Sequence, residues 1–168
     1  MKALPDFESE MASTRRTLER VPSDKLSWKP HEKSGTLGWL AQHIATMPHW
    51  GAVTLTTTEL SLDTLPPPQP TASTEELLAT FDKNVAEFRE QLEKVSDEDL
   101  NQRWICTWGG NTIIDAPRSE VLRVTVLNHI IHHRAQMTMY FRLLGVPVPG
   151  LYGPSADEMP GSAGGASA

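Results

Sequence analysis

The chain has 168 residues, of which 39% are hydrophobic and 21% are charged, as is typical of one soluble globular domain. Its net charge of −6 with scattered basic residues excludes nucleic acid as a partner, and its single cysteine, Cys106, excludes an intramolecular disulfide and a cysteine-based zinc site. The first residues form no apolar leader and no stretch reaches membrane-spanning length, so we expect a cytoplasmic protein without a membrane partner.

Two amphipathic helices are predicted in the first third of the chain. Apolar residues spaced three and four apart predict the first helix over residues 4–21, and Pro22 ends it. The second begins near Ser34 or Thr36, either of which could cap the free backbone amides. Pro48 lies inside this second helix, so we expect a kink or a break there.

Two further helices are predicted after a stiff connector. Residues 65–70, Leu-Pro-Pro-Pro-Gln-Pro, are polyproline-like and suit a long crossing between helices. A capping box at residues 73–76 begins the third helix. We expect residues 101–117 to be irregular, either a loop or a short hairpin. The fourth helix is predicted over 118–144, with Gly145 as its C-terminal cap.

Four amphipathic helices of this length predict an all-α fold, a four-helix bundle. Residues 1–159 are expected to form this single domain, and the Gly-, Ala- and Ser-rich residues 160–168 are expected to form a disordered tail. Trp104 and Trp108, before the fourth helix, either cover one end of the bundle, which we favour, or wall a pocket. Cys106 lies between them and is expected to be inert, because no basic neighbour in the sequence lowers its pKa.

Three histidines are predicted to point into the bundle. Successive residues turn by about 100° around a helix, which places His129 and His133 on one apolar stripe of the fourth helix. The same geometry places His43 on the inner stripe of the second helix, whereas His132 falls to the side of its own stripe. Two imidazoles four residues apart, with β-carbons about 5–6 Å apart, can bind one metal ion.

These three histidines are the dominant polar groups at core-facing positions. Burying each without a partner would cost about 1–3 kcal/mol, and no acidic residue on the stripes is available to satisfy them. A divalent ion (zinc or nickel first, iron or manganese otherwise) resolves this, because each neutral imidazole donates one nitrogen lone pair to it. The alternative is that the histidines are packed, hydrogen-bonded side chains, which is the commoner state of a single core histidine.

Three histidine ligands would leave coordination positions open, which is typical of a catalytic site. No Glu follows His129, so the arrangement is not the His-Glu-x-x-His protease motif. Without that base, the reaction would depend on a metal-bound water or thiol. Gln136 and Tyr140, further along the same stripe, are candidates for orienting this nucleophile; simple packing is the other interpretation.

Several sequence motifs resemble the DinB/YfiT-like superfamily of metal-dependent enzymes, over nearly the whole chain. They are residues 128–136 (NHIIHHRAQ), 140–145 (YFRLLG) and 148–154 (VPGLYGP), preceded by 26–30 (LSWKP) and 40–45 (LAQHIA). The resemblance implies a bundle with up–down–down–up topology, a metal held by His43, His129 and His133, and a homodimer. Characterised members include thiol-dependent S-transferases, a maleylpyruvate isomerase and hydrolase-like proteins.

We therefore predict a metal-dependent enzyme that activates a thiol or water against a small electrophilic substrate. If the enzyme is an S-transferase, its second small-molecule partner is expected to be a low-molecular-weight thiol. The alternative is a non-catalytic, metal-binding, dimeric stress-response protein, whose site a fourth ligand such as Asp157 or Glu158 would close. Arg134, on the face opposite the histidines, is expected to form a salt bridge or a dimer contact. The apolar residues of that face are Val124, Leu127, Ile131 and Thr138, a suitable dimer interface.

Overall fold

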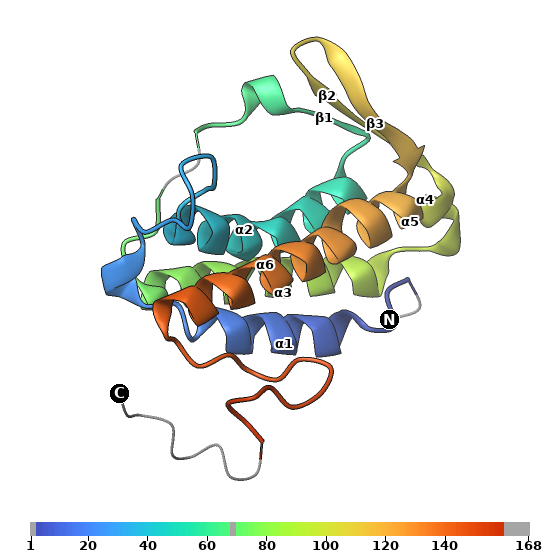
Figure 1. The fold of residues 1–168 in the computed structure, drawn as a ribbon. Helices are drawn as coiled ribbons and strands as arrows, with labels where there is room; N and C mark the ends of the chain where they lie inside the picture. Colours follow the sequence, from blue (N-terminus) through green and yellow to red (C-terminus); the bar gives the residue numbers. More distant parts are fainter. Residues whose placement is uncertain (1–2, 68–69, 160–168) are drawn as a thin grey trace, which may run out of the picture.

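The computed structural model describes residues 3–67 and 70–159, and long helices packed side by side form most of it (Figure 1). These helices are α1 (Phe7–Leu18), α2 (Leu37–Thr56), α3 (Thr74–Lys94) and α6 (His129–Leu144). The short α4 (Asp97–Asn101) follows α3, whereas α5 (Arg118–Glu120) and a π-helical stretch (Val121–Asn128) lead into α6. Two 3₁₀ turns, Ser23–Lys25 and Leu62–Thr64, lie in the connections. Both α1 and α2 contact α3 and α6.

Capping residues predicted from the sequence set the ends of these helices. The hydroxyl of Thr36 accepts a hydrogen bond from the backbone N–H of Trp39 at 3.1 Å where α2 begins. The hydroxyl of Ser73 accepts from the N–H of Glu76, also at 3.1 Å, where α3 begins. Gly145 ends α6 in the left-handed conformation with φ of +71°, which glycine adopts at little cost.

The helices enclose an apolar core that includes close contact between α2 and α3. Phe7 of α1 meets Phe88 of α3 edge to face, with ring centroids 5.1 Å apart. Gly51 of α2 faces the same ring, and a Cβ atom at this position would lie 2.4 Å from it. Other fully buried side chains are Leu18, Leu37, Ile44, Leu77, Phe81, Leu122 and Phe141. Removal of this apolar surface from water is the main force that holds the helices together.

The second helix runs without interruption through Pro48, so the break allowed by the sequence is not found. Proline lacks an N–H, which leaves the carbonyl of Ile44 without its usual helical donor. The buried side chain of Asn84 on α3 donates to the carbonyl of Ala45, in the same turn, at 2.9 Å. This side-chain bond adds a tertiary anchor where the helical ladder is weakest. His43 and the helical turns beyond Pro48 therefore belong to the same continuous helix.

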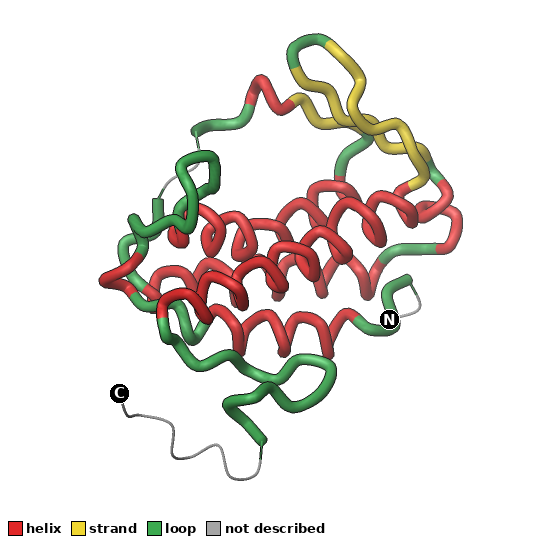
Figure 2. The backbone as a smooth tube through the Cα atoms, viewed as in Figure 1, coloured by secondary structure: helices red, strands yellow, loops and turns green. Residues whose placement is uncertain are grey.

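The predicted all-α four-helix bundle is wrong, because the chain also forms a three-stranded sheet at one end of the helices (Figures 1 and 2). β2 (Arg103–Trp108) pairs antiparallel with β3 (Asn111–Pro117). β1 (Glu59–Ser61) pairs parallel with β2, so the sheet is mixed. With this sheet and the additional short helices α4 and α5, the chain is not a plain four-helix bundle.

The sequence allowed a short hairpin in residues 101–117 but did not indicate the third strand. The alternation within β2 is short, with Trp104 and Cys106 buried between more exposed neighbours. The turn at Gly109 and Gly110 has φ values of +56° and +75°, a hairpin geometry that the sequence had left as one of two possibilities. β1 has only three residues and pairs with a strand remote in sequence, which no local pattern indicates.

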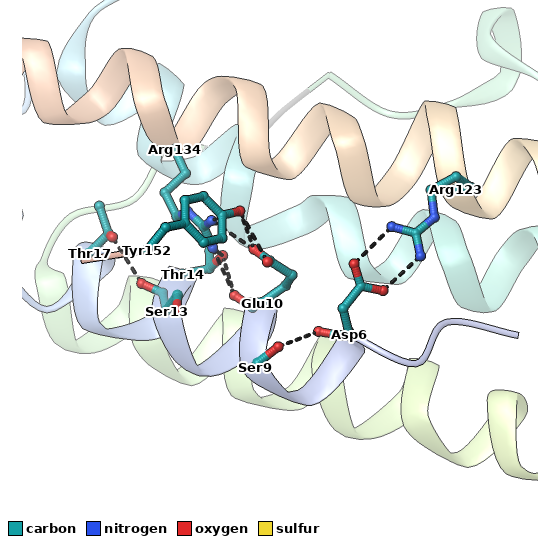
Figure 3. A network of polar contacts seen from close by, with 9 residues as sticks. All are labelled: Asp6, Ser9, Glu10, Ser13, Thr14, Thr17, Arg123, Arg134 and Tyr152. Carbon is teal, nitrogen blue, oxygen red and sulfur yellow. Dashed lines mark hydrogen bonds and ion pairs between the residues drawn. The ribbon is translucent and has the colours of Figure 1, made fainter. Parts of the chain in front are cut away.

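A buried polar network fixes α1 against α6 (Figure 3). Arg134, whose side chain is 1% exposed, contacts Glu10 at 2.7 Å and donates to the hydroxyl of Thr14 at 3.1 Å. The hydroxyl of Tyr152, from the segment beyond α6, donates to Glu10 and accepts from Arg134. Of the two roles expected for Arg134, the structure shows the salt bridge. The network thus ties α6, the helix that also carries His133, to α1 through Arg134.

The segment beyond α6 returns along α1 in Figure 1, and Glu158 near its end pairs with Arg16 of α1 at 3.2 Å. The predicted disordered tail, residues 160–168, lies outside the described residues. Among the helices of the described part of the chain, none is long and apolar enough to cross a membrane.

Candidate metal centre

Three histidine side chains from two helices converge between α2 and α6. His43 comes from α2, and His129 and His133 come from the first two turns of α6. The Nε2 atom of His129 lies 2.7 Å from Nε2 of His133 and 3.4 Å from Nε2 of His43. All three residues are half-buried, and one nitrogen from each ring lies within 4.8 Å of the others. Within residues 3–67 and 70–159, these three histidines are the cluster of at least three His, Cys, Asp or Glu side chains that is close enough to bind one metal ion.

In two of these rings, the Nδ1 nitrogen, which points away from the cluster, has a hydrogen-bond acceptor for its proton. Nδ1 of His129 donates to the carbonyl of Thr125 at 3.2 Å, and Nδ1 of His133 donates to Oε1 of Gln136 at 2.7 Å. With the protons on Nδ1, each neutral ring turns an Nε2 lone pair toward the other. Lone pairs facing each other at 2.7 Å repel unless a positive charge lies between them. The arrangement therefore fits a divalent metal ion.

The spacing of the nitrogens can be compared with that around zinc. Two nitrogens bound at about 2.0–2.1 Å in tetrahedral geometry lie about 3.4 Å apart. The separation between His43 and His129 already has this value. The separation between His129 and His133 would widen by roughly 0.6 Å, a change that small rotations of the two rings supply.

Burial keeps these imidazoles uncharged near neutral pH. Desolvation, followed by repulsion from His133 and His129, lowers the pKa of His43 from 6.5 to about 4. Desolvation is also the largest cause that lowers the pKa of His129, with His133 next. For His133, desolvation lowers the pKa and outweighs the opposing hydrogen bond to Gln136. The neutral ring is the form that binds a metal, so no proton has to be displaced near pH 7.

Trp39 lies against the cluster, a contact that was not predicted from the sequence. Its indole stacks on the ring of His43, with centroids 5.1 Å apart and 8° between the planes. It meets the ring of His133 edge-on at 6.4 Å. Because Trp39 is 50% exposed, it forms the side of the cluster that faces solvent. The signal that could have revealed it is its spacing of four residues from His43, which places both on one helix face.

The two residues predicted to orient a nucleophile have different surroundings. Gln136 contacts His133, as described above. The hydroxyl of Tyr140 instead donates to the carbonyl of Gly35 at 3.2 Å. His132 is exposed, and its ring lies 5.1 Å from that of His133 without joining the group of three.

The acidic residues considered as a fourth ligand are paired elsewhere. Asp157 accepts from Arg142 at 3.1 Å and from the backbone N–H of Val148 at 2.7 Å. Glu158 pairs with Arg16. Among the described residues the cluster thus contains three candidate ligands, which would leave coordination positions of a bound ion open.

The chain enters α6 through the π-helical stretch Val121–Asn128, directly before His129. Turns of this wider kind are frequent at functional sites. The carbonyl that accepts from His129 belongs to Thr125, within this stretch. The π-helical stretch therefore contributes to the orientation of the first histidine of α6.

A cavity of about 780 Å³ lies beside the cluster. Its wall includes His43 and Trp39, other residues of α2, and residues of the chain between β1 and α3. Trp104 and Trp108 do not line it. The indole of Trp104 is buried beneath the sheet and donates to the hydroxyl of Thr57 at 3.0 Å, whereas Trp108 is largely exposed.

Comparison with known proteins places the chain in a family. The family model described as the DinB family matches residues 2–163. This chain belongs to the DinB family. It is also 27% identical over 157 residues to the uncharacterised protein YrdA of Bacillus subtilis strain 168, and the match covers 92% of this chain and 89% of YrdA.

Solved structures of DinB-like proteins have a similar fold. One, from Bacillus cereus ATCC 10987, has a TM-score of 0.67 and 28% identity, over 89% of this chain and 95% of that protein. Another, YjoA from Bacillus subtilis, has a TM-score of 0.66 and 21% identity, over 88% of this chain and 97% of that protein. The family resemblance identified from the sequence motifs is thereby confirmed.

Proposed function

We propose that this DinB-family chain is a metal-dependent enzyme in which His43, His129 and His133 hold one divalent ion. Zinc or nickel is the first choice, and iron or manganese also accepts histidine. The observation that carries the proposal is the convergence of three Nε2 atoms, at separations of 2.7 and 3.4 Å, on rings that burial keeps neutral. When bound, the ion would supply Lewis acidity that lowers the pKa of a thiol or of water.

The residues around the histidines have supporting roles in this proposal. Thr125 and Gln136 hold the rings of His129 and His133 through Nδ1, which fixes the direction of the lone pairs and raises their basicity. Trp39 covers one face of the His43 ring. The group of candidate ligands contains no carboxylate, so the cluster itself offers no general base.

The reaction class that we propose is attack of a thiol or of water on a small electrophilic substrate, as in S-transfer or hydrolysis. The nucleophile gives its proton to solvent water and forms a bond to the electrophilic atom, and the leaving group departs with the electron pair of the broken bond. The three-ligand cluster and the adjoining cavity support this class, because catalysis needs exchangeable positions that small molecules can reach.

A non-catalytic, metal-binding stress-response protein is the alternative proposal. Such a protein would hold its ion in a closed site. The arginine pairs of Asp157 and Glu158, and the cavity that reaches His43, favour the enzyme.

We also propose that the protein is a cytoplasmic homodimer. Exposed apolar side chains at Val124, Met139 and Leu143, in the last helical segments, support self-association. Leu127, part of the interface predicted from the sequence, is fully buried and is therefore not available for it.

Turnover by metal-loaded protein tests the proposed reaction class. Protein stripped of metal is loaded separately with zinc, nickel, manganese or ferrous iron, and assayed with chlorodinitrobenzene plus cysteine and with nitrophenyl esters. We expect at least one metal to give a rate above those of the free ion and of the metal-free protein, and His133→Ala to abolish it. Full metal occupancy without turnover of any substrate would favour the non-catalytic alternative.

A further inference from the structure

The cavity beside the cluster lies between one face of α2 and the chain that connects β1 to α3. Side chains along α2, from Trp39 through Thr46 and Trp50 to Val53, form one wall. Leu60 of β1 and Leu65 of the connecting chain, among others, also line it. Its volume of about 780 Å³ is within the range of small-molecule sites, roughly 300–1,000 Å³.

The wall of this cavity is apolar and carries no strong charge. No Asp, Glu, Lys or Arg side chain lines it within the described part of the chain. Two indoles, Trp39 and Trp50, provide flat apolar surface. His49 also lines the cavity, and its Nδ1 is paired with Glu87 at 3.0 Å. A charged ligand would lose hydration here without gaining an opposite charge, which is costly, whereas an uncharged apolar ligand would gain from burial.

The polar side chain of Gln42, in the wall on α2, is available to a ligand. Gln42 is half-buried, and its amide has no hydrogen-bond partner among the described residues. The nearby hydroxyl of Thr46 already donates to the backbone carbonyls of Gln42 and His43, both at 3.0 Å. Gln42 can therefore donate one hydrogen bond to a ligand and accept another.

The cavity and the histidine cluster share one residue. His43 lines the cavity and also points Nε2 toward His129, while His129 and His133 do not line the cavity. Trp39 belongs to the wall and stacks on His43. A molecule held in this cavity would therefore lie next to the cluster, on the α2 side, without depending on the histidines of α6.

We propose that this cavity binds an uncharged, largely apolar small molecule with a flat body and one polar group that hydrogen-bonds to Gln42. The inference names the substrate class of the proposed enzyme, and it rests on the proposed function only for the statement that this molecule is the electrophile. Binding itself requires the cavity and not the metal. The neutral wall disfavours acidic or basic molecules as ligands of this cavity.

Three naphthalene derivatives of similar size separate the charge classes: neutral naphthamide, anionic naphthoate and cationic naphthylmethylammonium. Each is titrated into metal-free wild-type protein by calorimetry, with quenching of tryptophan fluorescence as a second signal. We expect naphthamide to bind at least about tenfold more tightly than either ion. Absence of naphthamide binding, or equal binding of an ion, would overturn the inference.

Variants locate the binding. Leu65→Arg adds a positive charge to the wall at a residue that is 42% exposed, and Ile113→Arg adds the same charge on β3, outside the wall, at a residue that is 49% exposed. We expect Leu65→Arg to shrink the preference for naphthamide over naphthoate by about tenfold, and Ile113→Arg to leave it unchanged. Equal effects of the two substitutions would show that the probe binds elsewhere.

Replacement of Gln42 tests the polar contact. Gln42→Leu should weaken binding of naphthamide by about fivefold and leave ethylnaphthalene, which lacks the amide, unaffected. A parallel loss for both compounds would contradict the hydrogen bond assigned to Gln42.

The double variant His129→Ala/His133→Ala separates this inference from the proposed function. We expect it to lose metal and to bind naphthamide within about twofold of wild type, because neither histidine lines the cavity. Metal binding in the wild type without naphthamide binding would overturn the cavity assignment alone. Naphthamide binding by a wild type that takes up no metal would overturn the proposed metal-dependent function alone.

Discussion

The Nε2 atoms of His129 and His133 lie 2.7 Å apart, while the Nδ1 atoms of the same two rings donate to Thr125 and Gln136. Two neutral imidazoles with these hydrogen bonds direct lone pairs at each other. The repulsion is relieved by a proton or by a metal ion, and burial disfavours the proton because it lowers the pKa of both rings. The orientation of the two rings is therefore preorganised to bind a metal cation between their Nε2 atoms.

Gln136 tests whether the outer hydrogen bond contributes to metal affinity. Gln136→Leu removes the acceptor of His133 Nδ1 at an exposed position, so metal affinity should fall by about 10- to 100-fold. Competition with a chromogenic chelator measures this affinity. The free energy of unfolding of the metal-free protein should change by less than about 0.5 kcal/mol. Gln136→Glu keeps an acceptor and should retain the affinity; equal losses in both variants would contradict this role.

The stability of the metal-free protein should depend on pH through His43. Its pKa is about 4 in the folded chain against 6.5 ordinarily, so between these values the unfolded chain binds more protons. Stability should therefore be highest above pH 6.5 and decline as the pH falls from 6.5 toward 4. Thermal unfolding followed by circular dichroism across this range measures the slope. His43→Asn should have a smaller slope, and an unchanged slope would show that His43 is not its source.

The buried pair of Arg134 and Glu10 should be sensitive to loss of one partner. Arg134→Ala leaves Glu10 buried without its cation, so the free energy of unfolding should fall by about 3–5 kcal/mol, measured by urea denaturation. The joint replacement Arg134→Met/Glu10→Gln should recover much of this loss. Arg142→Ala breaks a solvent-exposed pair with Asp157 and should cost much less stability than Arg134→Ala. Similar losses for Arg134→Ala and Arg142→Ala would contradict the importance of the buried network.

Self-association through the last helical segments predicts an effect of surface charge. Met139→Glu places a charge at a 62% exposed apolar position and should convert the proposed dimer to monomer in sedimentation velocity. Ile113→Glu, at an exposed position of β3, is the matched control and should leave the sedimentation coefficient unchanged. A wild-type chain that sediments as a monomer at all concentrations would contradict the proposed dimer.

The sequence predicted the long helices well, because their signals are local. Periodic apolar residues, the caps at Thr36 and Ser73, and the glycine after Leu144 each act within one or two turns. The β2–β3 hairpin was left as one of two possibilities for residues 101–117, and β1 was missed because its pairing with β2 depends on residues remote in sequence. The course of α2 through Pro48 depends on tertiary contacts, one of which is the hydrogen bond from Asn84 on α3 to Ala45.

The candidate site shows the same division. Helical geometry alone placed His43, His129 and His133 on inward faces, and the structure brings them together. The cavity was not predictable, because its walls combine α2 with the chain that follows β1. Arg134 was assigned to the face away from the histidines, but its burial depends on Glu10 and Tyr152, from segments that only the folded chain brings together.

Metal stoichiometry tests the central claim most directly. Untagged wild-type protein, purified without chelator and reconstituted with zinc or nickel, is compared by plasma mass spectrometry with His129→Ala/His133→Ala, after circular dichroism has shown both to be helical. We predict about one divalent ion per chain in the wild type and none in the double variant. A wild type without bound metal, or a double variant that keeps one ion per chain, would contradict the assignment of these histidines as ligands.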